Sequence, residues 1–164
     1  TGSNCAFVVG LKVGRKVGAS VGDIVVRSRI LVGLEVGEDV TFDDYLKVIE
    51  YKTATAFEVA ARIGAIIGGG NEEQIESLTE YGKNIGIAYQ IRDDLIDWKN
   101  EDKLFNLLIK KSNDPRNVFD KMEELLKNYS EKAKFGLRKI PDNEAKSHLE
   151  NLVKFTMFKA KLPY

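Results

Sequence analysis

The stretch from Tyr89 to Asp97, Tyr-Gln-Ile-Arg-Asp-Asp-Leu-Ile-Asp, constrains the fold more than any other part of the sequence. At about 3.6 residues per turn, an α-helix places Gln90 and the three Asp residues on one face over two turns. Like charges one turn apart destabilise a helix by roughly 0.2–0.5 kcal/mol per pair. The helix is therefore expected either to turn this face to water or to hold a cation between the carboxylates.

The side chains of this face indicate which cation would bind. Oxygen ligands without His or Cys favour Mg²⁺ or Ca²⁺ over zinc. Mg²⁺ takes one or two protein carboxylates and completes its octahedron with water and phosphate oxygens. We therefore expect Asp93, Asp94 and Asp97 to hold Mg²⁺ beside a phosphorylated or diphosphate substrate. The alternative interpretation is a solvated acidic helix face.

Composition excludes several classes of protein. The chain has 164 residues, of which 43% are hydrophobic and 30% charged, which suits one soluble domain with a substantial core. Its 25 basic and 25 acidic residues cancel, so no overall field favours nucleic acid or an anionic membrane. The single Cys5 excludes an intrachain disulfide and fits a reducing cytosol. No apolar run reaches the roughly 18 residues of a transmembrane helix.

Capping residues predict a series of helices. Thr41 with Asp44 is an N-cap pair, and the helix that it begins is expected to end near Tyr51. Lys52-Thr53 would then open a helix of small residues, which Gly68-Gly69-Gly70 ends. Asn71, with Gln74 at the capping-box position, would begin the long helix that carries the carboxylates.

Two more helices are expected toward the end of the chain. Asp114-Pro115 begins one, whose Phe119 and Met122 belong to a core stripe, and the turn at residues 140–143 leads into the last. Val and Ile in residues 19–40 would also suit strands, but the neighbouring helices favour a helix there. His148 lies among polar residues and is expected to be a solvated helix position. The predicted fold class is all-α.

Lys52-Thr53, followed by Gln90-x-x-Asp93-Asp94-x-x-Asp97, resembles the trans-isoprenyl diphosphate synthase family, the polyprenyl synthetases. In that family a Lys-Thr pair ends one helix, and the next long helix carries the second aspartate-rich motif. The resemblance implies an isoprenoid synthase-type helical bundle around a central cavity. Residues 2–10 and 129–158 extend the similarity, the latter to archaeal members.

Two features of the family pattern are absent from this sequence. The first aspartate-rich motif would precede Thr1, and the loop and helix that follow the second motif would come after Trp98. The chain is therefore expected to be a single domain over residues 1–164, lacking its amino-terminal part and that loop and helix.

The resemblance also implies an activity and a set of roles. The protein would condense an allylic diphosphate with isopentenyl diphosphate, with Mg²⁺, to a short-chain product such as geranylgeranyl or farnesyl diphosphate. Lys52, Thr53 and Gln90 would be catalytic and would bind substrate, and Lys103 would replace the lysine that follows the second motif. Family members of this kind imply a cytoplasmic homodimer.

Two other functions share these features. One is a non-catalytic subunit or regulator of such a synthase, an alternative that the absence of the first motif from this sequence leaves open. The other is a class I terpene cyclase, which shares the fold. Asp97 argues against the cyclase, whose second metal motif usually has Asn, Ser or Thr, and Glu at wider spacing.

Overall fold

The computed structural model describes residues 40–99 and 104–157, and every regular element within these ranges is helical. The elements are α2 (Phe42–Ile49), a π-helical segment (Glu50–Ala54), α3 (Thr55–Ile67), α4 (Glu72–Ile96), α5 (Leu104–Lys111), α6 (Pro115–Gly136), a 3₁₀ turn (Leu137–Lys139) and α7 (Glu144–Thr156). The prediction of an all-α fold is confirmed. The predicted amino-terminal helices before Val40 fall outside the described residues, as does Lys103.

The predicted helix starts are confirmed by their hydrogen bonds. Asp44 N–H donates to Thr41 Oγ1 at 3.2 Å, and Thr41 N–H donates to Asp44 Oδ2 at 3.2 Å. Asn71 and Gln74 form the same reciprocal pair at the start of α4, at 2.9 and 3.0 Å. These bonds satisfy backbone N–H groups that have no partner within the helix. Asp114 and Asn143 likewise cap α6 and α7.

The predicted break between Tyr51 and Lys52 is wrong, because the helical backbone continues from Phe42 to Ile67. The intervening residues Glu50–Ala54 form a π-helical turn. They contain no Gly or Pro to end the helix, and the hydroxyl of Thr55 donates to the backbone carbonyl of Glu50 at 3.0 Å. The first true stop is the glycine run, where Gly69 adopts a positive φ of 73°.

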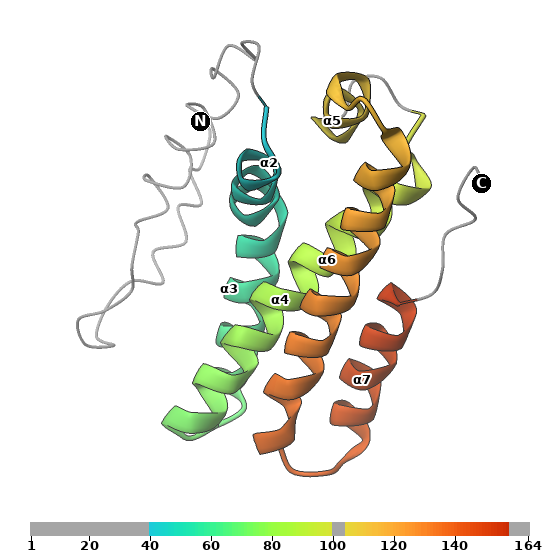
Figure 1. Ribbon diagram of the computed structural model, residues 1–164. Helices are drawn as coiled ribbons and strands as arrows, with labels where there is room; N and C mark the ends of the chain where they lie inside the picture. The colour runs from blue at the N-terminus through green and yellow to red at the C-terminus, as the bar shows by residue number, and fades with distance from the viewer. Residues whose placement is uncertain (1–39, 100–103, 158–164) are drawn as a thin grey trace, which may run out of the picture.

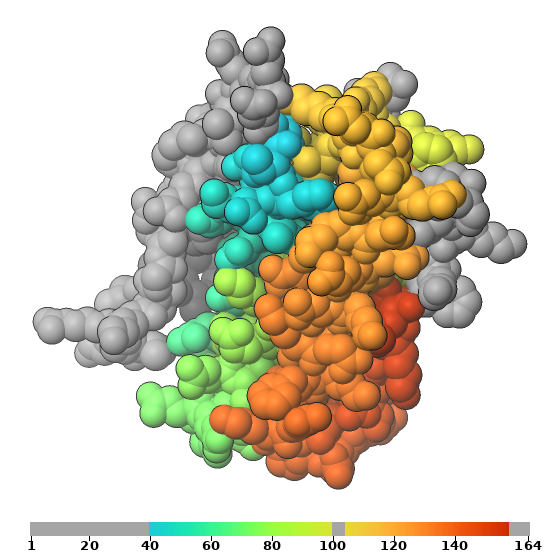
Figure 2. Space-filling model, viewed as in Figure 1, coloured from blue at the N-terminus to red at the C-terminus, as the bar shows by residue number. Residues whose placement is uncertain are grey.

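Helix α4 is the centre of the bundle. It packs most extensively against α3 on one side and α6 on the other, and α7 lies against α6 and α4 (Figure 1). The space-filling view shows α6 running across one face of the molecule, between α2 and α7 (Figure 2). The largest fully buried side chains at one end of α4 come from three further helices and are Tyr45, Phe105 and Phe119. Phe119 and Met122 are core residues, as predicted.

Two glycines on α4 allow α3 and the π-helical segment before it to approach closely. A Cβ atom at Gly82 would lie 2.6 Å from the backbone oxygen of Phe57, and one at Gly86 would lie 2.7 Å from Cα of Ala54. Atoms at these separations overlap, so only glycine fits without movement of a helix. Gly82, Gly86 and Gln90 follow one another at single-turn spacing, so the close approach continues directly to Gln90.

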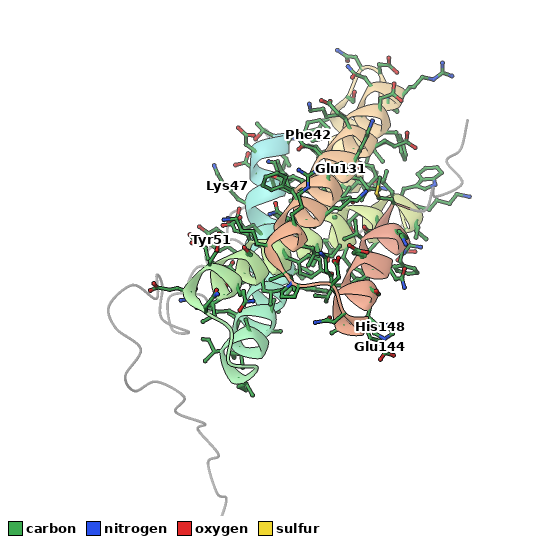
Figure 3. All side chains as sticks on the ribbon, turned by 90° about the horizontal axis from the view of Figure 1, so that it is seen from below. Phe42, Lys47, Tyr51, Glu131, Glu144 and His148 are labelled. Carbon is green, nitrogen blue, oxygen red and sulfur yellow. The ribbon has the colours of Figure 1, made fainter. Side chains whose placement is uncertain are left out.

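His148 lies on the surface of α7. His148 and Glu144 lie together on α7 and point away from the bundle (Figure 3), and the His148 side chain is 73% exposed. The predicted solvated position of His148 is confirmed. Within the part of the chain that the structure describes, no helix is long and apolar enough to cross a membrane.

Candidate active site

The π-helical segment carries both residues of the Lys-Thr pair. Lys52 is exposed and Thr53 is half-buried, on the side that faces α4. A π turn accommodates one more residue than an α turn, and such turns frequently occur at functional sites. Here the widened turn lies opposite Gln90, beyond the point where Gly86 brings the two helices together.

A hydrogen bond connects the two predicted motifs. Thr53 Oγ1 donates to Gln90 Oε1 at 2.7 Å, although the residues lie 37 positions apart in the sequence. The other end of the Gln90 amide, Nε2, donates to Asp94 Oδ1 at 3.1 Å. The structure therefore brings together three of the predicted site residues, Thr53, Gln90 and Asp94.

Tyr45 completes this group from α2. Its hydroxyl donates to Asp94 Oδ2 at 2.7 Å, and its side chain is fully buried. Burial, and after it the charge of Asp94, raises the pKa of Tyr45 well above its ordinary value of 10. Tyr45 was not among the predicted site residues, because nothing in the sequence separates it from the other apolar and aromatic positions of its helix. Tyr45, Asp94, Gln90 and Thr53 are called the polar chain below.

The three carboxylates do not share one environment. Asp94 is 5% exposed, Asp93 is half-buried, and Asp97 is exposed at the C-cap of α4. Neighbouring residues on a helix point about 100° apart, and Asp94 is the one whose carboxylate accepts the hydroxyl of Tyr45 on α2. The backbone N–H of Asp97 still donates to the carbonyl of Asp93 at 3.0 Å, which keeps these two residues one turn apart.

This arrangement fits Mg²⁺ better than a metal held by protein alone. Among residues 40–99 and 104–157, no three His, Cys, Asp or Glu side chains gather closely enough to hold a metal ion. Mg²⁺ commonly uses one or two carboxylates and takes its other ligands from water and phosphate. Asp93 and Asp97 provide a hard-oxygen pair of that kind.

Two pockets lie elsewhere on the described part of the molecule. One of about 430 Å³ is lined by Leu95, by residues of α6 and by Met157. The other, of about 480 Å³, lies between the glycine-rich end of α3, α4 and the start of α7. Neither lining includes Lys52, Thr53 or the three Asp residues, so the cavity expected beside the carboxylates is not one of these two.

Comparison with known proteins gives consistent similarities over part of the chain. Residues 31–111 match the sequence profile of the family described as polyprenyl synthetase. The chain is 44% identical over 63 residues to a geranylgeranyl diphosphate synthase of Methanosarcina mazei, which covers 38% of this chain and 19% of that protein. It is 47% identical over 66 residues to a geranylfarnesyl diphosphate synthase of Natronomonas pharaonis, covering 40% of this chain and 19% of that protein. These matches span about a fifth of the length of each relative.

Solved structures show the same fold over most of the chain. A geranyltranstransferase from Methanosarcina mazei superimposes with a TM-score of 0.67 at 27% identity, over 82% of this chain and 48% of that one. A decaprenyl diphosphate synthase from Rhodobacter capsulatus gives 0.70 at 25% identity, over 82% and 55%. The chain thus spans about half the length of these structures.

Proposed function

We propose, because residues 31–111 place the chain in the polyprenyl synthetase family, that the protein is a prenyltransferase that joins an allylic diphosphate to isopentenyl diphosphate. Its product would be a short-chain isoprenyl diphosphate such as geranylgeranyl or farnesyl diphosphate. The hydrogen bond from Thr53 to Gln90 carries this proposal, because it joins the Lys-Thr pair to the carboxylate helix at one place in the fold.

The proposed roles follow from the exposure and chemistry of each side chain. The exposed ammonium group of Lys52 binds the diphosphate of the allylic substrate through charge-assisted hydrogen bonds. Mg²⁺, when bound, supplies positive charge to the leaving pyrophosphate. Asp93 and Asp97 are the accessible carboxylates that would hold it. Thr53 and Gln90 lie at the reaction centre.

The reaction proceeds by ionisation, condensation and elimination. The carbon–oxygen bond of the allylic diphosphate breaks, and its electron pair leaves with pyrophosphate. The double bond of isopentenyl diphosphate then attacks the allylic cation, and a proton leaves the adjacent carbon to restore a double bond. Lys52 holds the departing anion in place, while the oxygens of Thr53 and Gln90 provide negative dipole ends near the cation.

The homodimer implied by the family resemblance is part of the proposal. Helix α3 exposes an apolar face made by Val59, Ile63, Ile66 and Ile67, of which Ile67 is 81% exposed. Apolar patches of this kind suit an interface between two copies of a chain. Light scattering of the full-length protein tests this directly, and a monomer at all concentrations would contradict it.

The activity is tested with full-length protein and radiolabelled isopentenyl diphosphate. Label should enter longer isoprenyl diphosphates when an allylic diphosphate and Mg²⁺ are present, and incorporation should stop in EDTA. Turnover that persists in EDTA would refute the metal requirement. Absence of incorporation with any allylic diphosphate would favour the non-catalytic subunit, and cyclic hydrocarbons formed without isopentenyl diphosphate would favour the cyclase.

A further inference from the structure

The polar chain has a single direction. Thr53 donates to Gln90 at 2.7 Å, and Gln90 donates to Asp94 at 3.1 Å. Tyr45 donates to the second oxygen of the same carboxylate at 2.7 Å. Asp94 therefore accepts at both oxygens. In each of the three bonds the donor lies farther along the polar chain from Asp94 than its acceptor does, or donates to Asp94 itself.

Asp94 determines this direction because each of its two oxygens accepts a hydrogen bond, one from Tyr45 and one from Gln90. Gln90 must turn its NH₂ group toward Asp94, and its carbonyl oxygen then faces Thr53. Thr53 must donate its only hydroxyl proton to that oxygen. A Thr hydroxyl has one proton and two lone pairs, so lone pairs are what Thr53 has left to offer a substrate.

Tyr45 holds the carboxylate in this arrangement. Asp94 is 5% exposed, and burying a carboxylate is costly unless its oxygens are hydrogen-bonded. Tyr45 is itself fully buried, and its hydroxyl donates to Asp94 Oδ2 at 2.7 Å. A donor fixed at one oxygen leaves the other oxygen directed at Gln90.

We infer that Asp94 and Tyr45 are positioning residues that fix the polarity of the chain, so that Thr53 offers oxygen lone pairs and not a proton to the allylic cation. This inference rests on the proposed prenyl transfer. It also divides the aspartate-rich stretch into two roles. Asp93 and Asp97 serve the metal, and Asp94, whose two oxygens are already occupied, serves Gln90 and Thr53.

The test uses full-length protein with Tyr45→Phe and Asp94→Asn, and with Asp93→Asn as the matched carboxylate control. The first readout needs no turnover: it is the rise in melting temperature produced by Mg²⁺ with inorganic pyrophosphate. Tyr45→Phe and Asp94→Asn should keep this rise, and Asp93→Asn should lose most of it. A rise that Asp94→Asn loses to the same extent as Asp93→Asn would overturn the division of roles.

The second readout is the split between kcat and KM. Tyr45→Phe and Asp94→Asn should lower kcat roughly 10- to 100-fold, with little change in KM for the allylic diphosphate, because the cation exists only after binding. Thr53→Ser, which keeps the hydroxyl, should retain most of kcat. A rise in KM with unchanged kcat in Tyr45→Phe would overturn the inference.

A double-mutant comparison separates positioning from general damage. If Tyr45 acts through Thr53, Tyr45→Phe should cost little more in a Thr53→Val background, whereas independent effects would multiply. Multiplied losses would contradict the inference. This comparison uses Tyr45→Phe, Thr53→Val and the double variant but not Asp94→Asn, so it decides the matter even if Asp94→Asn does not fold. Failure of the wild-type protein to transfer prenyl groups would instead remove the proposed function, while the Mg²⁺ pyrophosphate readout would still report the role of Asp94.

Discussion

Gly86 of α4 lies so close to Ala54 that a Cβ atom on the glycine would be 2.7 Å from the Cα atom of the alanine. The same added atom would be 3.0 Å from Cβ of Phe57. Gln90 follows Gly86 by one turn, and Thr53 immediately precedes Ala54. Gly86 has no side chain, so the two helices can come close enough for Thr53 and Gln90, one turn away, to form their 2.7 Å hydrogen bond.

Gly86→Ala should destabilise the protein by roughly 1–3 kcal/mol, because the added methyl group forces the two helices apart in a packed interior. It should also lower activity more than the loss of stability explains, since the Thr53–Gln90 hydrogen bond lengthens. Gly64→Ala is the control, because a Cβ at Gly64 meets nothing within 4 Å. There the change should stabilise α3 by up to about 1 kcal/mol. Urea unfolding measures both, and equal effects of the two variants would contradict the argument.

Local structure was predicted well where single residues decide it. The helix starts at Thr41, Asn71 and Asp114 are fixed by side-chain hydrogen bonds to backbone only a few residues away, so the sequence contains all the groups involved. For α7 only the turn at residues 140–143 was predicted, and the structure adds the cap at Asn143. The stop at the triple glycine is equally local. The break expected at Lys52 failed because the choice between a helix end and a π turn depends on packing against α4.

The site was only partly predictable for the same reason. Helical periodicity placed Gln90 and the three Asp residues on one face, but it could not distinguish Asp94 from Asp93. That distinction depends on Tyr45, which comes from another helix 49 residues earlier. The single-turn row of Gly82, Gly86 and Gln90 is the sequence signal that could have indicated a close helix contact leading into the site.

Lys52→Ala should weaken use of the allylic diphosphate. Removing a charge-assisted donor from such a site should lower kcat/KM by an amount that corresponds to roughly 2–4 kcal/mol of transition-state free energy. The melting temperature should change little, because Lys52 is exposed. Lys47→Ala on α2 is a suitable control, since its side chain is 64% exposed and its ion pair with Asp44 is long, at 4.0 Å. Steady-state assays of both variants decide the matter: a Lys52→Ala protein with normal kcat/KM would show that the lysine has no part in binding.

Asn71→Ala should destabilise α4 by about 1 kcal/mol, because it removes the acceptor of the Gln74 N–H and one half of the capping box. The loss should appear as a lower denaturation midpoint with an unchanged slope. Asn71→Ser, which can still cap, should retain most of the stability. Asn128→Ala, at an exposed position within α6, removes an amide without a cap and should be close to neutral. An Asn128→Ala variant as unstable as Asn71→Ala would rule out the cap as the cause.

Glu58→Gln should stabilise the protein at neutral pH and not in acid. Glu58 lies where α3 crosses α4, and burial there raises the pKa of its carboxyl above the ordinary value of 4.5, while Lys83 lowers it in part. Because the folded pKa exceeds the unfolded one, the folded state binds the proton more tightly. The destabilisation that the partly buried, ionised Glu58 carboxyl causes is absent below its pKa in the unfolded chain. It develops as the pH rises from there through the pKa in the folded protein, and it is complete above that pKa. The melting temperature of Glu58→Gln should therefore match that of the wild type near about pH 4 and exceed it near about pH 7.

Glu131→Gln is the control for this prediction, because it removes the same charge from an exposed position and should give no such pH-dependent gain. An equal gain in both variants would mean that net charge and not burial is responsible.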